Sequence, residues 1–149
     1  MEYLKIFLMS LFVAALITIN PLVNAQDTTA TLTVTSPVDG QIGSGTSQIW
    51  TFSAVEGEVL SFVVHTTSVN LDPQFTISNS KGDPFLSNDD YAYPDNQDAL
   101  LEAITMPRTD TYRLTVAGMG TTLGSYTLTM LSGFSQTALS DNFNADVQW

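Results

Sequence analysis

Six oxygen-bearing side chains in the middle of the sequence have the chemistry of a cation site. They are Asp72, Asn88, Asp89, Asp90, Asp95 and Asp98. Calcium takes roughly six to eight oxygen ligands in proteins, mostly from carboxylates and carbonyls, and a bound cation offsets the repulsion between carboxylates held close together. The spacing is that of neither an EF-hand loop nor a glycine-rich calcium repeat. Two interpretations therefore stay open: a calcium site, or a solvated loop in which the aspartates hydrogen bond to their own backbone.

Two tyrosines, Tyr91 and Tyr93, lie inside this acidic stretch, next to Pro94. Exposed tyrosines beside a rigid proline can stack on sugars or on a proline-rich polymer. The alternative is that they fold back over the edge of the core. The first interpretation predicts that Tyr91 and Tyr93 bind a ligand.

The sequence offers little material for catalysis. Asp89 and Asp90 are adjacent, so in an extended chain they point to opposite sides, whereas glycoside hydrolysis needs two carboxyl groups facing each other across a cleft. The chain has one histidine, His65, and no cysteine, which excludes a three-histidine zinc site, thiolate metal sites and cysteine nucleophiles. We expect His65 to be a surface or strand-end histidine, and we expect that the chain is not an enzyme.

The elements that must position these residues are predicted by alternation of apolar and polar side chains, the period typical of strands. Seven segments show it: 31–36, 49–54, 59–65, 74–78, 100–106, 110–117 and 124–131. Glycine and proline mark turns between them at 37–40, 56–58, 80–84 and 118–120. In segment 100–106, Glu102 interrupts the alternation, which indicates a bulge or an edge position. We predict an all-β, antiparallel, jelly-roll-like β-sandwich of about eight strands, with Trp50 in its core.

The N-terminus has the pattern of a cleaved signal helix. Residues 6–19 are almost wholly apolar, and Val23 and Ala25 suit cleavage before Gln26. The run is shorter than the roughly 20 residues that a membrane-spanning helix needs. We therefore predict a signal peptide at 1–25, the sandwich domain at 26–131, and at 132–149 either a linker or the start of a truncated following domain.

The net charge of −11 falls on the exported part, because Glu2 and Lys5 cancel within the signal segment. Such a surface repels phosphate backbones and anionic lipid, so neither nucleic acid nor, after signal cleavage, a membrane is an expected partner. Acidic surfaces also aid solubility, which accounts for much of the charge.

Residues 40–130 resemble the bacterial pre-peptidase C-terminal domain family, whose members are accessory β-sandwiches appended to secreted peptidases and other exported proteins. The resemblance lies in the order of short motifs: 50–52 with 56–59, Leu71–Ile77, Gly82 with Ser87–Asp90, Pro107, Thr111-Tyr112, and Gly124–Leu128. The chain has Asp110 where the family usually has glycine. The resemblance implies the sandwich fold, and it is compatible with calcium binding, which is attributed to some members.

These observations predict a secreted, non-catalytic accessory or binding module that is a monomeric part of a larger extracellular protein. It would hold an extracellular polymer or a partner domain, with calcium as a cofactor if the acidic residues form a site. The alternative is a structural spacer or an adhesin segment of a cell-surface protein. A binding module should expose aromatic residues near Tyr91 and Tyr93, whereas a spacer should have only a polar surface.

Overall fold

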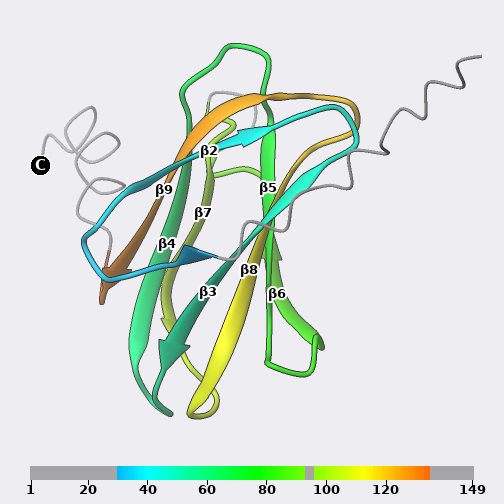
Figure 1. Cartoon of the computed structure of the whole chain (residues 1–149). Coiled ribbons are helices and arrows are strands. Elements are labelled where there is room, and N and C mark those ends of the chain that lie inside the picture. Colours follow the sequence, from blue (N-terminus) through cyan, green and yellow to red (C-terminus); the bar gives the residue numbers. More distant parts are fainter. Residues whose placement is uncertain (1–29, 93–95, 135–149) are drawn as a thin grey trace, which may run out of the picture.

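The computed structural model describes residues 30–92 and 96–134, which form nine strands in two facing sheets (Figure 1). The strands are β1 (Ala30–Thr31), β2 (Val38–Ile42), β3 (Ser47–Ala54), β4 (Val59–Thr66), β5 (Pro73–Ser78), β6 (Pro84–Asn88), β7 (Ala99–Thr105), β8 (Asp110–Gly118) and β9 (Gly124–Ser132). Within these residues there is no helix of the length and apolarity that crossing a membrane requires. The predicted signal peptide at 1–25 and the tail from residue 135 onward lie outside the described residues.

The sheets have the strand orders β1-β3-β8-β5-β6 and β2-β9-β4-β7. From β2 to β9, every connection passes from one sheet to the other except the one between β5 and β6. This is the arrangement of a jelly roll, and the predicted antiparallel sandwich is confirmed. The short β1 pairs in parallel with β3. The described residues form nine strands where about eight were expected, and β6 lies outside the seven segments that the sequence predicts.

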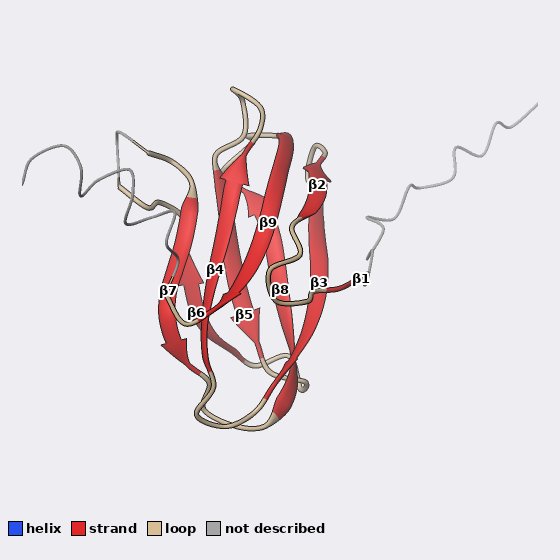
Figure 2. Ribbon diagram, turned by 90° about the vertical axis from the view of Figure 1, so that its left-hand side faces the viewer, coloured by secondary structure: helices blue, strands red, loops and turns tan. Residues whose placement is uncertain are grey.

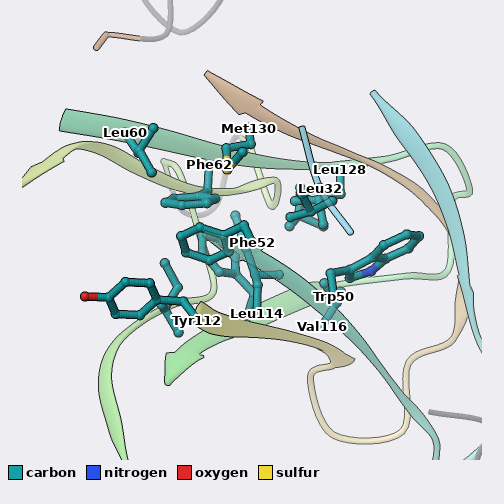
Figure 3. Close-up of a cluster of buried hydrophobic side chains, with 14 of the residues drawn as sticks. Leu32, Trp50, Phe52, Leu60, Phe62, Tyr112, Leu114, Val116, Leu128 and Met130 are labelled. Carbon is teal, nitrogen blue, oxygen red and sulfur yellow. The ribbon is translucent and has the colours of Figure 1, made fainter. Parts of the chain in front are cut away.

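The core lies between the sheets and is formed by side chains at alternate positions of the strands (Figure 3). Leu60 and Phe62 of β4 are fully buried, as are Leu114 of β8 and Leu128 of β9. The ring centroids of Phe52 and Phe62, which come from opposite sheets, lie 4.9 Å apart. Burial of this alternating set is the main force that closes one sheet on the other.

Trp50 is in the core, as predicted, with 5% of its surface exposed. Its indole Nε1–H donates a hydrogen bond to Tyr126 Oη over 2.8 Å, and that hydroxyl donates to Gln48 Oε1 over 2.7 Å. Burial raises the pKa of Tyr126 to about 12. The two aromatic side chains therefore carry their polar atoms into the interior with partners.

The N-terminal strand predictions were wrong in detail. Segment 31–36 was expected to be a strand, but pairing stops at Thr31, and Thr35 turns the chain with a φ of 63°. Segment 37–40 was expected to be a turn, but from Val38 it belongs to β2. The reason is tertiary: a Cβ atom on Gly40 would lie 2.2 Å from Tyr126 Cζ, so the glycine serves a close approach rather than a turn.

Strand β7 is both an edge strand and bulged, as the sequence indicated. The register with β4 shifts between Leu60 and Phe62, and Ala103 opposite this shift has a φ of 53°. The amide of Ala103 donates to the hydroxyl of Ser61 over 2.9 Å. Bulges of this kind protect an exposed edge from pairing with another chain.

Candidate functional site

The predicted site residues lie at one end of the sandwich, because consecutive strands alternate in direction. Loop residues 67–72, 89–92, 96–98 and 119–123 meet there, at the upper end of the strands in Figures 1 and 2. We call these residues the acidic end. Loops 55–58, 79–83 and 106–109 form the opposite end.

Three of the predicted cation ligands come together at the acidic end. The pKa of Asp72 is raised from its ordinary value, first by partial burial and then by the negative charges of Asp90 and Asp89. The Oδ1 atom of Asp90 is buried and has no hydrogen-bond partner among the described residues. An unpartnered buried carboxylate oxygen beside two other carboxylates is the donor chemistry of a hard cation.

As these side chains stand, they do not complete a metal site. Within 30–92 and 96–134, no three Asp, Glu, His or Cys side chains have an arrangement that could hold a metal ion. Asp95, a further carboxylate of the predicted site, lies outside the described residues.

The remaining two predicted ligands have structural partners. Asp98 accepts a hydrogen bond from the Thr66 amide over 2.9 Å, and its other oxygen lies 2.6 Å from Nδ1 of His65. Asn88 accepts a hydrogen bond from the Leu100 amide over 2.9 Å, so it joins the end of β6 to the edge strand β7. Both side chains tie the loop to the sheets.

His65 is the strand-end histidine that the sequence predicts, next to the last residue of β4 and with 62% of its side chain exposed. It lies in a row of polar side chains across the outer face of the four-stranded sheet. His65 is opposite Thr127, whose hydroxyl donates to Asp39 Oδ1 over 2.9 Å. In the described part of the chain, the side-chain partner of His65 is Asp98.

Tyr91 is only partly exposed, and its amide donates to the Asp98 carbonyl over 2.5 Å. Tyr93 lies outside the described residues. The predicted pair of exposed aromatic residues is therefore neither confirmed nor contradicted as a binding surface.

Sequence reasoning missed a group of apolar side chains on the loops of the acidic end. Val69 is 100% exposed, Leu123 is 44% exposed and Met119 is 39% exposed. Each stands alone among polar or small residues in the sequence, and an isolated apolar residue in a loop gives no sign of whether it packs inward. The group is visible only once the fold has joined the two loops.

Neither of two surface depressions is lined by these apolar side chains. The larger, of about 620 Å³, is lined mainly by polar groups: Asp39, Gly40, Gln41, Gln48, Thr67, Ser125 and Tyr126. The other, of about 280 Å³, is at the opposite end, lined by Asn79, Lys81, Asp83, Phe85, Pro107, Arg108, Asp110 and Tyr112. There the pKa of Asp110 is lowered, chiefly because its carboxylate accepts hydrogen bonds from Ser80.

No family model matches the sequence, and no curated protein matches it either. Among solved structures, the chain is similar to the pre-peptidase C-terminal domain of collagenase from Bacillus anthracis. That match has a TM-score of 0.58 and 12% identity, and covers 72% of this chain and 98% of that domain.

Two periplasmic lysozyme inhibitors of g-type lysozyme also match, each with a TM-score of 0.45. The one from Aeromonas hydrophila is 12% identical and covers 68% of this chain and 95% of its own. The one from Salmonella Typhimurium is 14% identical, and the match covers 69% of this chain and 96% of the inhibitor. The likeness to the collagenase domain shows the fold: this chain is an all-β sandwich of the kind found in pre-peptidase C-terminal domains.

Proposed function

We propose that this chain is a secreted, non-catalytic accessory module that holds an extracellular polymer or a partner domain. The observation that carries the proposal is the likeness of its sandwich to a domain appended to a collagenase. The apolar segment 6–19 and the pattern suited to cleavage before Gln26 support export. In such a module the sandwich acts as a rigid scaffold, and the loops at its ends do the binding.

The exposed surface favours binding over spacing. A spacer needs only a polar surface, whereas the acidic end presents Val69, Met119 and Leu123 to solvent. Apolar groups gathered on neighbouring loops are typical of an interaction surface.

Retention on insoluble polymers tests the proposal. The protein is mixed with cellulose, peptidoglycan and fibrous collagen in turn, the polymer is sedimented, and the bound fraction and any soluble fragments are measured. We expect retention on one of these polymers without release of fragments. Release of fragments by the pure protein would contradict a non-catalytic role. Absence of the protein from all three sedimented polymers would contradict the polymer-binding role.

Calcium is the cofactor that we propose for the acidic end. Asp72, Asp89 and Asp90 would hold it, with Asp95 as the further predicted ligand, and the cation would supply charge compensation that fixes the loop. The unpartnered Oδ1 of Asp90 and the raised pKa of Asp72 support this. Binding requires these carboxylates to turn toward a common point, because they do not form a metal site as they stand.

Thermal unfolding with calcium or with chelator tests the cofactor. A ligand that binds only the folded state raises the melting temperature, so we expect millimolar calcium to raise it in the wild type and not in Asp90→Asn. Glu56→Gln is the matched control, because it removes one negative charge at the opposite end. An unchanged melting temperature in the wild type would show that the acidic residues form an ordinary solvated loop.

A further inference from the structure

Backbone hydrogen bonds join the two loops of the acidic end that carry these apolar side chains. Val69 lies on the β4–β5 loop, and Met119 and Leu123 lie on the β8–β9 loop. The Met119 amide donates to the Asp72 carbonyl over 2.7 Å, and the Leu123 amide donates to the Asn70 carbonyl over 3.3 Å. Backbone hydrogen bonds thus join the two loops at Asn70 and Asp72, just after Val69.

A close contact at the base of the loops strengthens this junction. Gly124 has a φ of 151°, and a Cβ atom there would lie 1.9 Å from Ser68 Oγ. Ser68 Oγ in turn accepts a hydrogen bond from the Ser125 amide over 3.0 Å. The two loops are therefore interlocked, so a partner that binds their tips does not have to order them first.

Packing within the described chain leaves Val69 wholly exposed and Met119 and Leu123 partly exposed. Val69 contributes nothing to the core, because its whole side-chain surface faces solvent. Single exposed apolar residues need no explanation, but a group on interlocked loops does. Burial in a partner surface is the event that would remove these side chains from water.

The charge around them identifies the chemistry of the partner. The carboxylates of Asp72, Asp89 and Asp90 lie beside these loops. Lys81 and Arg108, by contrast, are on loops of the opposite end, and Arg113 pairs with Ser78 near it. No lysine or arginine of the described chain lies at the acidic end.

We propose that the acidic end docks onto a protein surface that has an apolar depression rimmed by lysine and arginine. Val69, Met119 and Leu123 enter the depression, and the carboxylates face the basic rim. Complementary potentials favour this partner, whereas the like charge of a second acidic end or of an anionic lipid surface opposes approach. The inference rests on the proposed binding function and names the class of its partner.

Titration with designed peptides tests this proposal. The probe is a short helical peptide of leucine and lysine, and the comparison peptide has glutamate in place of lysine. We expect the leucine–lysine peptide to shift the backbone amide resonances of residues 67–72 and 119–123. We expect its affinity to fall as sodium chloride rises from about 50 to about 500 mM, because salt screens the charges.

Two matched variants separate this surface from general acidity. The double variant Val69→Ser with Leu123→Ser should weaken peptide binding at least about tenfold, since each apolar side chain loses its burial. Val55→Ser is the control, because Val55 is 57% exposed at the opposite end and its loss should leave the affinity unchanged. All these positions are exposed, so the melting temperatures should match that of the wild type.

Several results would overturn the inference. These are equal affinity for the leucine–glutamate peptide, resonance shifts confined to other loops, absence of binding, or tighter binding to vesicles of phosphatidylcholine and phosphatidylserine. Retention of the double variant on a polymer or partner domain at the wild-type level would overturn this inference alone. If neither the wild type nor any variant, Val55→Ser included, is retained, that result would instead overturn the proposed function.

Discussion

Gly40 has no side chain, which leaves room for the Tyr126 side chain to hydrogen bond with Trp50 of the other sheet. The Tyr126 ring lies where a Cβ atom of residue 40 would be, and Gln48 Oε1 is 2.5 Å from the same point. That position lets the tyrosine hydroxyl reach both Trp50 and Gln48. A residue with turn chemistry thus serves packing inside a strand.

Gly40→Ala should therefore destabilise the protein by about 1–3 kcal/mol, the usual cost of forcing extra volume into a packed region. Urea unfolding measures this change. Gly43→Ala is the control, because the nearest atom to a Cβ atom there is 3.4 Å away. An equal loss in both variants would contradict a specific role for the contact between Gly40 and Tyr126.

The raised pKa of Tyr126 predicts the response to alkali. The folded state holds the phenol proton up to about pH 12, whereas the unfolded chain releases it near pH 10. The stability that the Tyr126 phenol contributes should therefore be fully present below about pH 10 and be lost as pH rises from 10 to 12. Unfolding free energies across this range should fall more steeply for the wild type than for Tyr126→Phe.

The same variant should cost about 1–3 kcal/mol at pH 7, because the buried Trp50 Nε1–H loses its acceptor. Chemical unfolding followed by tryptophan fluorescence measures this. A neutral effect would mean that water replaces the hydroxyl.

Replacing the Asp72 carboxylate should stabilise the protein, whereas most substitutions destabilise a folded protein. The raised pKa of Asp72 means that the folded state disfavours its charge, through burial and through Asp90 and Asp89. Asp72→Asn should raise the melting temperature in chelator at pH 7, by a few degrees at most, because Asp72 is partly exposed and solvent screens its interactions. Scanning calorimetry with Glu56→Gln as control measures it, and a lower melting temperature would contradict the repulsion.

At the scale of the element, the edge strand β7 combines two protective features. The Asn88 side chain accepts a hydrogen bond from the Leu100 amide. Ala103 lies in a bulge, and its amide donates a hydrogen bond to the Ser61 hydroxyl. Ser61 is a fully buried polar residue whose hydroxyl also donates to the Gly133 carbonyl. Together these contacts close an edge that would otherwise be free to pair.

Ser61→Ala should cost about 1–3 kcal/mol, because the Ala103 amide is left without its acceptor. It should also increase aggregation, since the bulge loses its support. Urea unfolding and light scattering measure the two effects. Ser53→Ala, at an exposed position of β3, is the control for loss of a strand hydroxyl.

Strands β3, β4, β5, β7, β8 and β9 were largely predictable because their alternation reflects burial on one face. Strand β6 was not among the predicted segments, because none of its residues is fully buried. Strand β2 was not, because its Asp39 and Gly40 are turn-forming residues locally, and only contact with Tyr126 explains them. The meeting of Asp72 with Asp89 and Asp90 follows from strand ends that share one end of the sandwich. The pairing of Asp98 with His65 depends on neighbours across the sheet, which spacing along the chain does not reveal.

At the scale of the whole molecule, the crossing connections make most strand pairs distant in sequence. Among the strands that the structure describes, β5 and β6 are the only consecutive ones paired in one sheet. We expect refolding in milliseconds to seconds, as is typical of such all-β topologies. Stopped-flow fluorescence of Trp50 in a Trp149→Phe variant measures the rate, and refolding within microseconds would contradict this dependence on topology.

The two strands nearest the C-terminus, β8 and β9, are interior strands of the two sheets: β8 pairs with β3 and β5, and β9 pairs with β2 and β4. Each sheet therefore waits for an interior strand that is synthesised after both of its neighbours. A chain cut short before Gly124 retains β2 and β4 with no neighbour between them, and so cannot keep half of its architecture. In this topology the five-stranded sheet is continuous only once β8 has been made, and the four-stranded sheet only once β9 has been made.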